Sequence, residues 1–275
     1  MKKLFLIFAA LNIAALALSA CAPAPAPAAE TVGDNASVAE NPTGVAGAEA
    51  VAPADPGDAV LWTQDYITQV PPIMMIEPYF EIFGQTAGPV PYYYEEAVKL
   101  AGHSCGAVAG AWTITKKALE ALYPNGEYPV RGQIFVEAPG AEDEWFVGVF
   151  GDVIMYITGA APKTGFNGSD FAVNDLYVRQ NKMIYTEKPT NQLPPMREWI
   201  FTRLDTGAKV GVKFNLAIIT PLSTPARVEM GKKMALGQAT PEEAADYIKY
   251  WNDRAFFVFE NADMDGFFTI VTYDK

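Results

Sequence analysis

Apolar residues return every three or four positions between Gly106 and Leu122, which is the pattern of a helix with one buried side. The next segment, 123–129, reads YPNGEYP and has the composition of a turn, so it ends this helix. Residues 145–159 are apolar almost throughout, and their periodicity fits a buried helix or a buried strand. The stripe of the first helix consists of Val108, Trp112, Thr115, Leu119 and Leu122.

Alternating or continuous apolar runs predict strands in the second half of the chain. Residues 170–188 are expected to form a hairpin with its turn at 179–182. The two closing strands would flank the turn NADMDG at 261–266. The predicted single strands are 130–138, 209–219, 255–260 and 266–273.

Residues 224–254 predict two further helices. The second begins after Thr240, with Pro241 at its first position and Glu243 completing a capping box. Strands that run together after two helices, with helices returning later, favour an α+β fold over regular βαβ alternation. We therefore expect buried helices on a mainly antiparallel sheet, followed by C-terminal helices and strands.

The first 21 residues have the features of a bacterial lipoprotein signal peptide. Two lysines precede an apolar run that is too short for an ordinary membrane span, and Leu18-Ser19-Ala20-Cys21 resembles a lipobox. We expect cleavage before Cys21 and a lipid on its thiol, which would anchor the protein to the bacterial cell envelope. Ala22, in place of an aspartate, predicts the periplasmic face of the outer membrane in a Gram-negative cell.

Composition divides the remaining chain into two parts. Residues 22–57 are rich in Ala and Pro and contain no aromatic residue, so they are expected to form a disordered tether. Residues 58–275 carry enough aromatic and aliphatic side chains for an α+β domain with its own core.

The charge of the chain excludes some partners. The full sequence has a net charge of -12, with 32 acidic residues. This balance argues against nucleic acid and against binding to anionic headgroups, so the lipid on Cys21 would be the contact with the membrane. A small-molecule ligand and a second copy of the chain remain open as partners.

His103 and Cys105 lie two positions apart in GHSCG, and His103 is the only histidine of the sequence. If Cys21 carries a lipid, Cys105 has no disulfide partner within the chain. A thiolate at the start of the helix and a neighbouring imidazole suit a transition metal such as zinc, but two ligands do not complete a tetrahedral site. The alternative is a buried thiol beside a hydrogen-bonded loop histidine.

GHSCGAVAGAWTITKKALEAL at 102–122 and GDVIMYITGAAPKTGF at 151–166 resemble the FmdE family of formylmethanofuran dehydrogenase domains over about residues 90–190. The resemblance implies zinc bound by His103 and Cys105, with Asp152 as an additional candidate ligand. Members of the family have further ligands where this chain has other residues, and most bacterial members have no assigned reaction. The residues at those family ligand positions are Ala101, Val149 and Ala160.

Other residues could complete a site near this motif. Asp143, in the acidic segment 142–144, is a candidate ligand, although such a segment is also typical of a solvated loop. Lys163 corresponds to a lysine turn of the family, and Tyr94 could form the wall of a pocket above His103 and Cys105.

Three functions follow from these observations. The first is an extracytoplasmic, membrane-tethered domain that binds a metal, with zinc as the expected cofactor. The second is an enzyme in which His103 activates Cys105, or in which an open metal site activates water. The third is a non-catalytic interaction lipoprotein whose ancestral metal site has decayed.

Overall fold

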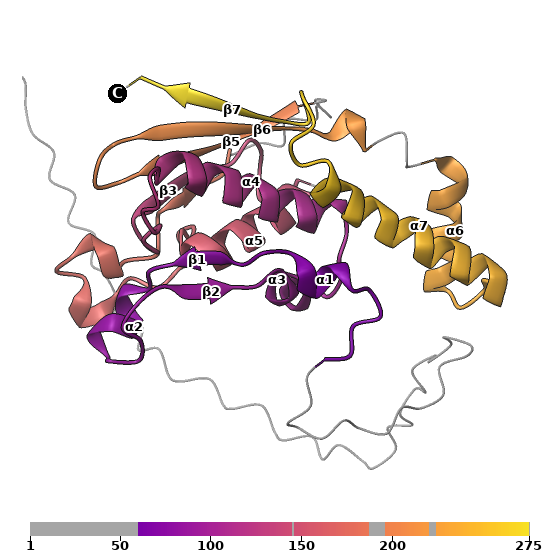
Figure 1. The fold of residues 1–275 in the computed structure, drawn as a ribbon, viewed down its shortest axis with the longest axis horizontal. Helices are drawn as coiled ribbons and strands as arrows, with labels where there is room; N and C mark the ends of the chain where they lie inside the picture. Colours follow the sequence, from indigo (N-terminus) through magenta and orange to yellow (C-terminus); the bar gives the residue numbers. More distant parts are fainter. Residues whose placement is uncertain (1–59, 145, 187–195, 220–223, 275) are drawn as a thin grey trace, which may run out of the picture. The chain divides into compact units, whose positions relative to one another are not determined.

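A layer of helices covers one face of a five-stranded sheet (Figure 1). The computed structural model describes residues 60–144, 146–186, 196–219 and 224–274. The helices α4 (Gly106–Leu122) and α5 (Val147–Thr158) lie against the sheet. The combination of helices with a mainly antiparallel sheet confirms the predicted α+β fold.

The five-stranded sheet has the order β4-β3-β5-β6-β7. β3 pairs in parallel with β4, and the other three pairings are antiparallel. In β5 and β6 alternate side chains are buried, as expected for strands with one face on a core. The strands are β3 (Ile134–Glu137), β4 (Met183–Ile184), β5 (Met196–Arg203), β6 (Lys209–Asn215) and β7 (Phe268–Tyr273).

The N-terminal part of the described chain forms a smaller layer next to α4 and α5. It contains a two-stranded antiparallel sheet and three short helices, none of which the sequence analysis assigned as separate elements. In chain order these elements are α1 (Tyr66–Gln69), β1 (Ile73–Met75), α2 (Pro78–Ile82), β2 (Val90–Tyr92) and α3 (Tyr94–Ala101).

The central helix α4 has the bounds that the sequence pattern predicts. It is buried on more than one side, since it contacts the sheet, α5 and the C-terminal half of α7 (Pro241–Glu260). Gly110 permits the closest approach to the sheet, because a Cβ there would lie 2.6 Å from Cε1 of Phe214 on β6. The close packing of α4 on the sheet therefore depends on a glycine at position 110.

The structure decides the ambiguous segment 145–159 in favour of a helix, α5. Gly159 ends this helix in the left-handed conformation, with φ 70°. Val153, Ile154 and Ile157 are buried, which explains why the segment is apolar almost all round.

Two sequence predictions of local structure are wrong. Residues 170–186, the described part of the predicted hairpin, do not form one: two 3-10 helices, η1 (Ser169–Phe171) and η2 (Asp175–Tyr177), precede β4, which pairs with β3. Residues 255–260 are not a strand but the last turns of α7. Ala255 and Val258 are buried there, so a helix packed on α4 accounts for the same apolar run.

The predicted helices at 224–254 are confirmed, whereas the predicted hairpin turn at 261–266 is wrong. The capping box of Thr240 and Glu243 is present at the start of α7, and α6 (Pro225–Ala235) precedes it. The turn at 261–266 therefore joins a helix to β7 and does not join two strands. The strand at 209–219 ends at Asn215 and continues as η3 (Leu216–Ile218).

Predictions for the signal peptide, Cys21 and the tether 22–57 lie outside the described residues. Within the described part, no helix combines the length and apolar character needed to cross a bilayer.

Candidate functional site

The GHSC segment forms the link between α3 and α4. Gly102 ends α3 in the left-handed conformation with φ 72°, and Cys105 is the extended residue that precedes α4. The expected position of Cys105 at a helix N-terminus is therefore confirmed.

Ser104 is the residue that fixes this link to the rest of the protein. Its Oγ lies 2.8 Å from the Tyr66 hydroxyl and 2.7 Å from the Tyr94 hydroxyl, and both contacts are buried. Its carbonyl oxygen accepts a hydrogen bond of 2.7 Å from Nε1 of Trp251 on α7. Sequence reasoning missed Ser104, because its partners are 10, 38 and 147 positions away.

Tyr94 is a core residue and lines neither of the two hollows described below. Its ring packs edge-on against Trp112 and Phe259, with centroids 5.6 Å and 4.8 Å away. Burial raises the pKa of its hydroxyl far above the ordinary value, so the group stays neutral. Tyr94 is thus packed in the core, and its role as a pocket wall above His103 and Cys105 stays a prediction.

His103 and Cys105 differ in exposure. His103 is exposed, and its Nδ1 lies 3.0 Å from the carbonyl oxygen of Ala101. Cys105 is partly buried, and burial raises the pKa of its thiol. The nearby amides of Ala107 and Val108 and the Arg254 guanidinium act in the opposite direction but more weakly.

The donors predicted for a metal do not meet in a three-ligand site. Among the described residues, no three His, Cys, Asp or Glu side chains are grouped so that they could hold a metal ion. Asp143 is exposed in the loop before α5, and Asp152 is exposed on α5 itself. Lys163 is exposed after α5. With the cation of Arg254 acting on Cys105, the donors among the described residues do not make up a complete zinc site.

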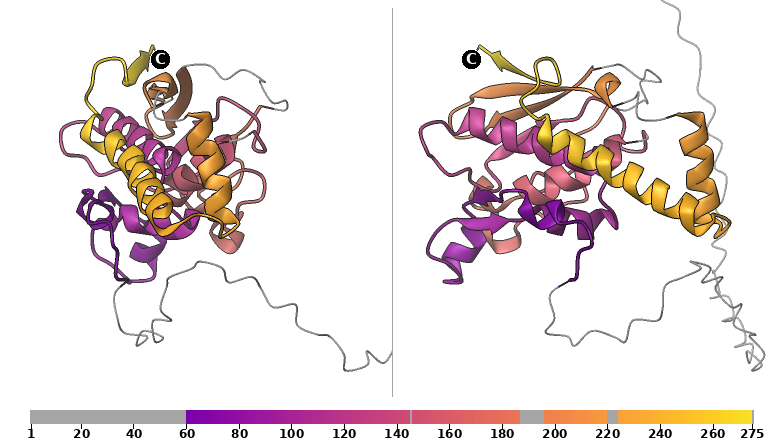
Figure 2. Two further views of the ribbon diagram at one scale, coloured as in Figure 1. Left: turned by 90° about the vertical axis from the view of Figure 1, so that its right-hand side faces the viewer. Right: turned by 45° about the vertical axis from the view of Figure 1, so that its right-hand side comes forward.

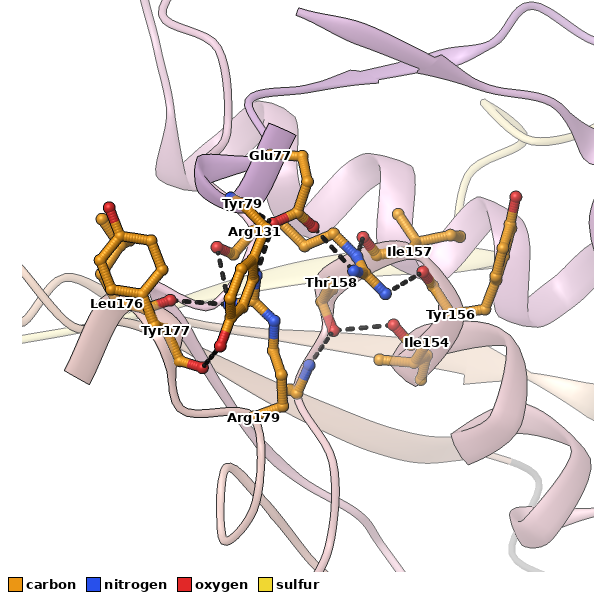
Figure 3. A network of polar contacts seen from close by, with 11 residues as sticks. Glu77, Tyr79, Arg131, Ile154, Tyr156, Ile157, Thr158, Leu176, Tyr177 and Arg179 are labelled. Carbon is orange, nitrogen blue, oxygen red and sulfur yellow. Dashed lines mark hydrogen bonds and ion pairs between the residues drawn. The ribbon is translucent and has the colours of Figure 1, made fainter. Parts of the chain in front are cut away.

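A second polar cluster, which sequence reasoning also missed, lies at the C-terminal end of α5 (Figure 3). Glu77 accepts from Arg131 at 2.8 Å and from Arg179 at 2.7 Å. Arg131 also donates to the carbonyls of Tyr156 and Ile157 in the last turn of α5, where a cation is favourable. Burial lowers the pKa of Arg179. The cluster ties α2, α5 and the segment before β4 together.

Lys182 lies beside this cluster and is itself buried. Its Nζ donates to the carbonyl oxygens of Gly132 and Asp175, each at 2.5 Å. Burial, together with the charge of Arg179, lowers the pKa of Lys182 to about 8. All of these contacts are internal, so the cluster holds the fold together and offers no open site.

Two hollows of about 540 Å³ and 370 Å³ lie along one side of α4. Both hollows are lined by Lys116 and Glu120, so we treat them as one site and name it the α4 groove. Trp112 lines the first hollow and Tyr123 the second, three helical turns apart or roughly 16 Å. The apolar lining consists mainly of Tyr66, Val70, Pro71, Phe256 and Phe259 in the first hollow and Ile73, Met74, Leu119 and Tyr128 in the second.

The first hollow contains a buried donor without a partner and an exposed carboxylate without an ion pair among the described residues. The Nε1 of Trp112 is buried and has no hydrogen-bond partner in the described part of the chain. Glu260 on α7 forms no ion pair with another described residue, whereas Lys117 pairs with Asp263 at 2.8 Å and Lys116 with Glu120 at 3.8 Å. The lysines of the groove are thus neutralised, and one carboxylate is left over.

Comparison of the chain with protein-family models, with curated proteins and with solved structures found no match. The resemblance to the FmdE family therefore stays a prediction from the quoted motifs.

Proposed function

We propose that the protein is a non-catalytic binding protein, anchored at the bacterial cell envelope through Cys21, with the α4 groove as its ligand site. The observation that supports this most directly is the aromatic lining of the first hollow, formed by Tyr66, Trp112, Phe256 and Phe259. Hollows of a few hundred Å³ that combine aromatic side chains with placed polar groups can serve as ligand sites, and here charged side chains of α4 and α7 accompany the aromatic ones. The anchor rests on the signal sequence and the lipobox.

The ligand is an elongated organic molecule with an apolar body and a positive charge. Its body would lie along the three turns of α4 between Trp112 and Tyr123. Its cation would lie near Glu260 and over the ring of Phe256, because aromatic faces and an unpaired carboxylate both attract positive charge.

A matched pair of probes tests this proposal: hexyltrimethylammonium and hexanoate, titrated into the full chain in nanodiscs of zwitterionic lipid. The cation is expected to bind about tenfold more tightly than the anion, since a cation–π contact and a partly screened ion pair together contribute about 1–2 kcal/mol. Isothermal titration calorimetry measures both affinities. Glu260→Gln should reduce binding of the cation and leave binding of the anion nearly unchanged.

The variant Phe256→Ala tests whether the probes bind in the α4 groove. Phe256 is 40% exposed, so its removal should abolish binding without unfolding the protein. Phe80→Ala is the control, because Phe80 is 37% exposed on α2 and does not line the groove. Binding that survives Phe256→Ala, or no binding of either probe, would overturn the proposal. Equal binding of the two probes would overturn only the assignment of charge.

The metal-binding alternative can be tested through the zinc content of the protein and of a Cys105 variant. If the groove is the functional site, mass spectrometry should find less than about 0.1 equivalent of zinc in the full chain and in Cys105→Ser alike, because two donors bind zinc weakly. A thiol reagent should titrate Cys105 fully after unfolding and slowly in the native protein, whose thiol pKa is raised. Zinc near one equivalent that is lost in Cys105→Ser would instead establish the metal site.

The enzymatic alternative has less support from the geometry. Activation of Cys105 would need His103 as a base, but the His103 side chain is exposed whereas the Cys105 thiol is partly buried, and burial raises the pKa of that thiol.

A further inference from the structure

The strand β7 is an edge of the five-stranded sheet, because β6 is its only partner among the described strands. Figure 2 shows β7, the yellow arrow that ends at C, at the border of the described part of the molecule. The opposite edge strand, β4, contains two residues, whereas β7 contains six. A very short edge strand offers few free hydrogen-bond groups, so β7 is the edge that can accept another strand.

Hydrogen bonds in the sheet identify the backbone groups of β7 that point away from β6. The amide of Asn215 donates to the carbonyl oxygen of Phe267 at 2.9 Å, which continues the register of β6 and β7 by one residue. In an antiparallel ladder only every second residue bonds the neighbouring strand, so the residues between them direct their N–H and C=O groups to the free edge. These outward residues are Phe268, Ile270 and Thr272.

The sequence of β7 has none of the features that commonly protect a sheet edge. Phe268–Tyr273 reads FTIVTY and contains no charged residue, no Pro and no Gly. Ile270 is in register with the buried Val212, so its side chain lies on the face that the helices cover, yet it is 46% exposed. The described helices thus leave this edge position uncovered, and an added strand would bury it.

The outward residues are centred on Ile270, which makes the edge complementary to a second copy of itself. A two-fold axis perpendicular to the sheet would place Ile270 opposite Ile270 of the other copy, with Phe268 opposite Thr272 on either side. Each of these pairs exchanges two hydrogen bonds, so every outward N–H and C=O group of the strand would find a partner. The two Ile270 side chains would meet on the helix side and remove each other's apolar surface from water.

We propose that β7 pairs with β7 of a second copy of this chain about a two-fold axis at Ile270, which joins the two sheets into one. The free backbone groups identify the partner as an extended strand, and their symmetric arrangement about Ile270 identifies that strand as another β7. Within Phe268–Tyr273 no like charges would face one another. This pairing does not depend on whether the α4 groove binds a ligand.

Opposite charges introduced at position 270 test this proposal. Analytical ultracentrifugation of the full chain in detergent is expected to show a dimer that forms with increasing concentration. Ile270→Lys and Ile270→Glu should each weaken this dimer at least about tenfold, because the axis places like charges opposite each other. An equimolar mixture of the two variants should restore dimers, since opposite charges then meet at the axis.

The matched controls are Ile248→Lys and Ile248→Glu, because Ile248 lies on α7 and is 47% exposed, close to the value for Ile270. Both controls should leave the dimer unchanged. Thr272→Pro removes an outward N–H without a change of charge, which an edge strand tolerates, and should also weaken the dimer. Circular dichroism should show that each variant keeps the secondary structure of the unmodified chain.

Three results would overturn the proposal. The first is a monomer at every concentration of the full chain. The second is a dimer that Ile270→Lys and Thr272→Pro leave intact. The third is a mixture of Ile270→Lys and Ile270→Glu that stays monomeric, because pairing centred on Ile270 requires the two charges to face each other.

Discussion

Replacing Glu77 by Gln is expected to lower the free energy of unfolding by about 3–5 kcal/mol, because it leaves the buried Arg179 and the half-buried Arg131 without their counter-charge. The side chain of Glu77 is 3% exposed and that of Arg179 only 2%. Both carboxylate oxygens are in use, one for each arginine. A urea titration of the full chain, followed by tryptophan fluorescence, measures the loss.

The Glu77→Gln variant removes the negative charge of the side chain and keeps its size and shape. It retains the side-chain oxygen that accepts from the amide of Tyr79 at the start of α2, so the helix cap persists. Glu81→Gln is the control, since Glu81 lies on the same helix and is exposed. That variant should change the free energy of unfolding by less than about 0.5 kcal/mol. A loss below about 1 kcal/mol in Glu77→Gln would mean that water or relaxation compensates the buried arginines.

Phe214→Ala is expected to cost about 3–5 kcal/mol, because it leaves a cavity where the sheet meets the helices. Phe214 is 1% exposed on β6. Its ring stacks on Phe268 with centroids 4.7 Å apart, and Phe267 and Phe150 lie at 5.4 Å and 6.0 Å. The same urea titration applies.

Gly110 allows a double-mutant test of this contact. Gly110→Ala alone should cost about 1–3 kcal/mol, since the new methyl group meets the ring of Phe214. In the Phe214→Ala background the cost should fall by at least about 1 kcal/mol, because the closest contact is gone and only the ring of Phe150, 3.2 Å away, remains near the new methyl group. Gly88→Ala is the control, as no atom lies within 4 Å of its Cβ position. Strictly additive losses would show that α4 does not depend on this close approach.

The candidate site could be predicted from the sequence only in part. The sequence indicated that Cys105 precedes a helix, because the periodicity from Gly106 to Leu122 is local information. Trp112 was assigned to the buried stripe, and its place in the α4 groove could have been suspected from Lys116 and Tyr123 on the same side of the helix. The opposite wall of the groove comes from α7, more than 130 positions further along the chain.

What the sequence by itself determined is therefore the set of features that depend on neighbouring residues. The bounds of α4, the capping box of Thr240 and Glu243, and the α+β class all follow from periodicity and short-range hydrogen bonding. These features need no knowledge of distant segments.

Only the tertiary structure decided the features in which distant segments compete for the same residues. The apolar run at 255–260 continues a helix because α4 offers it a surface, although its composition suits a strand equally well. In GHSC, Ser104 makes the long-range contacts, because Tyr66, Tyr94 and Trp251 form hydrogen bonds with it from three different helices. Burial of these groups, and of Glu77 between two arginines, depends on long-range contacts that local patterns do not encode.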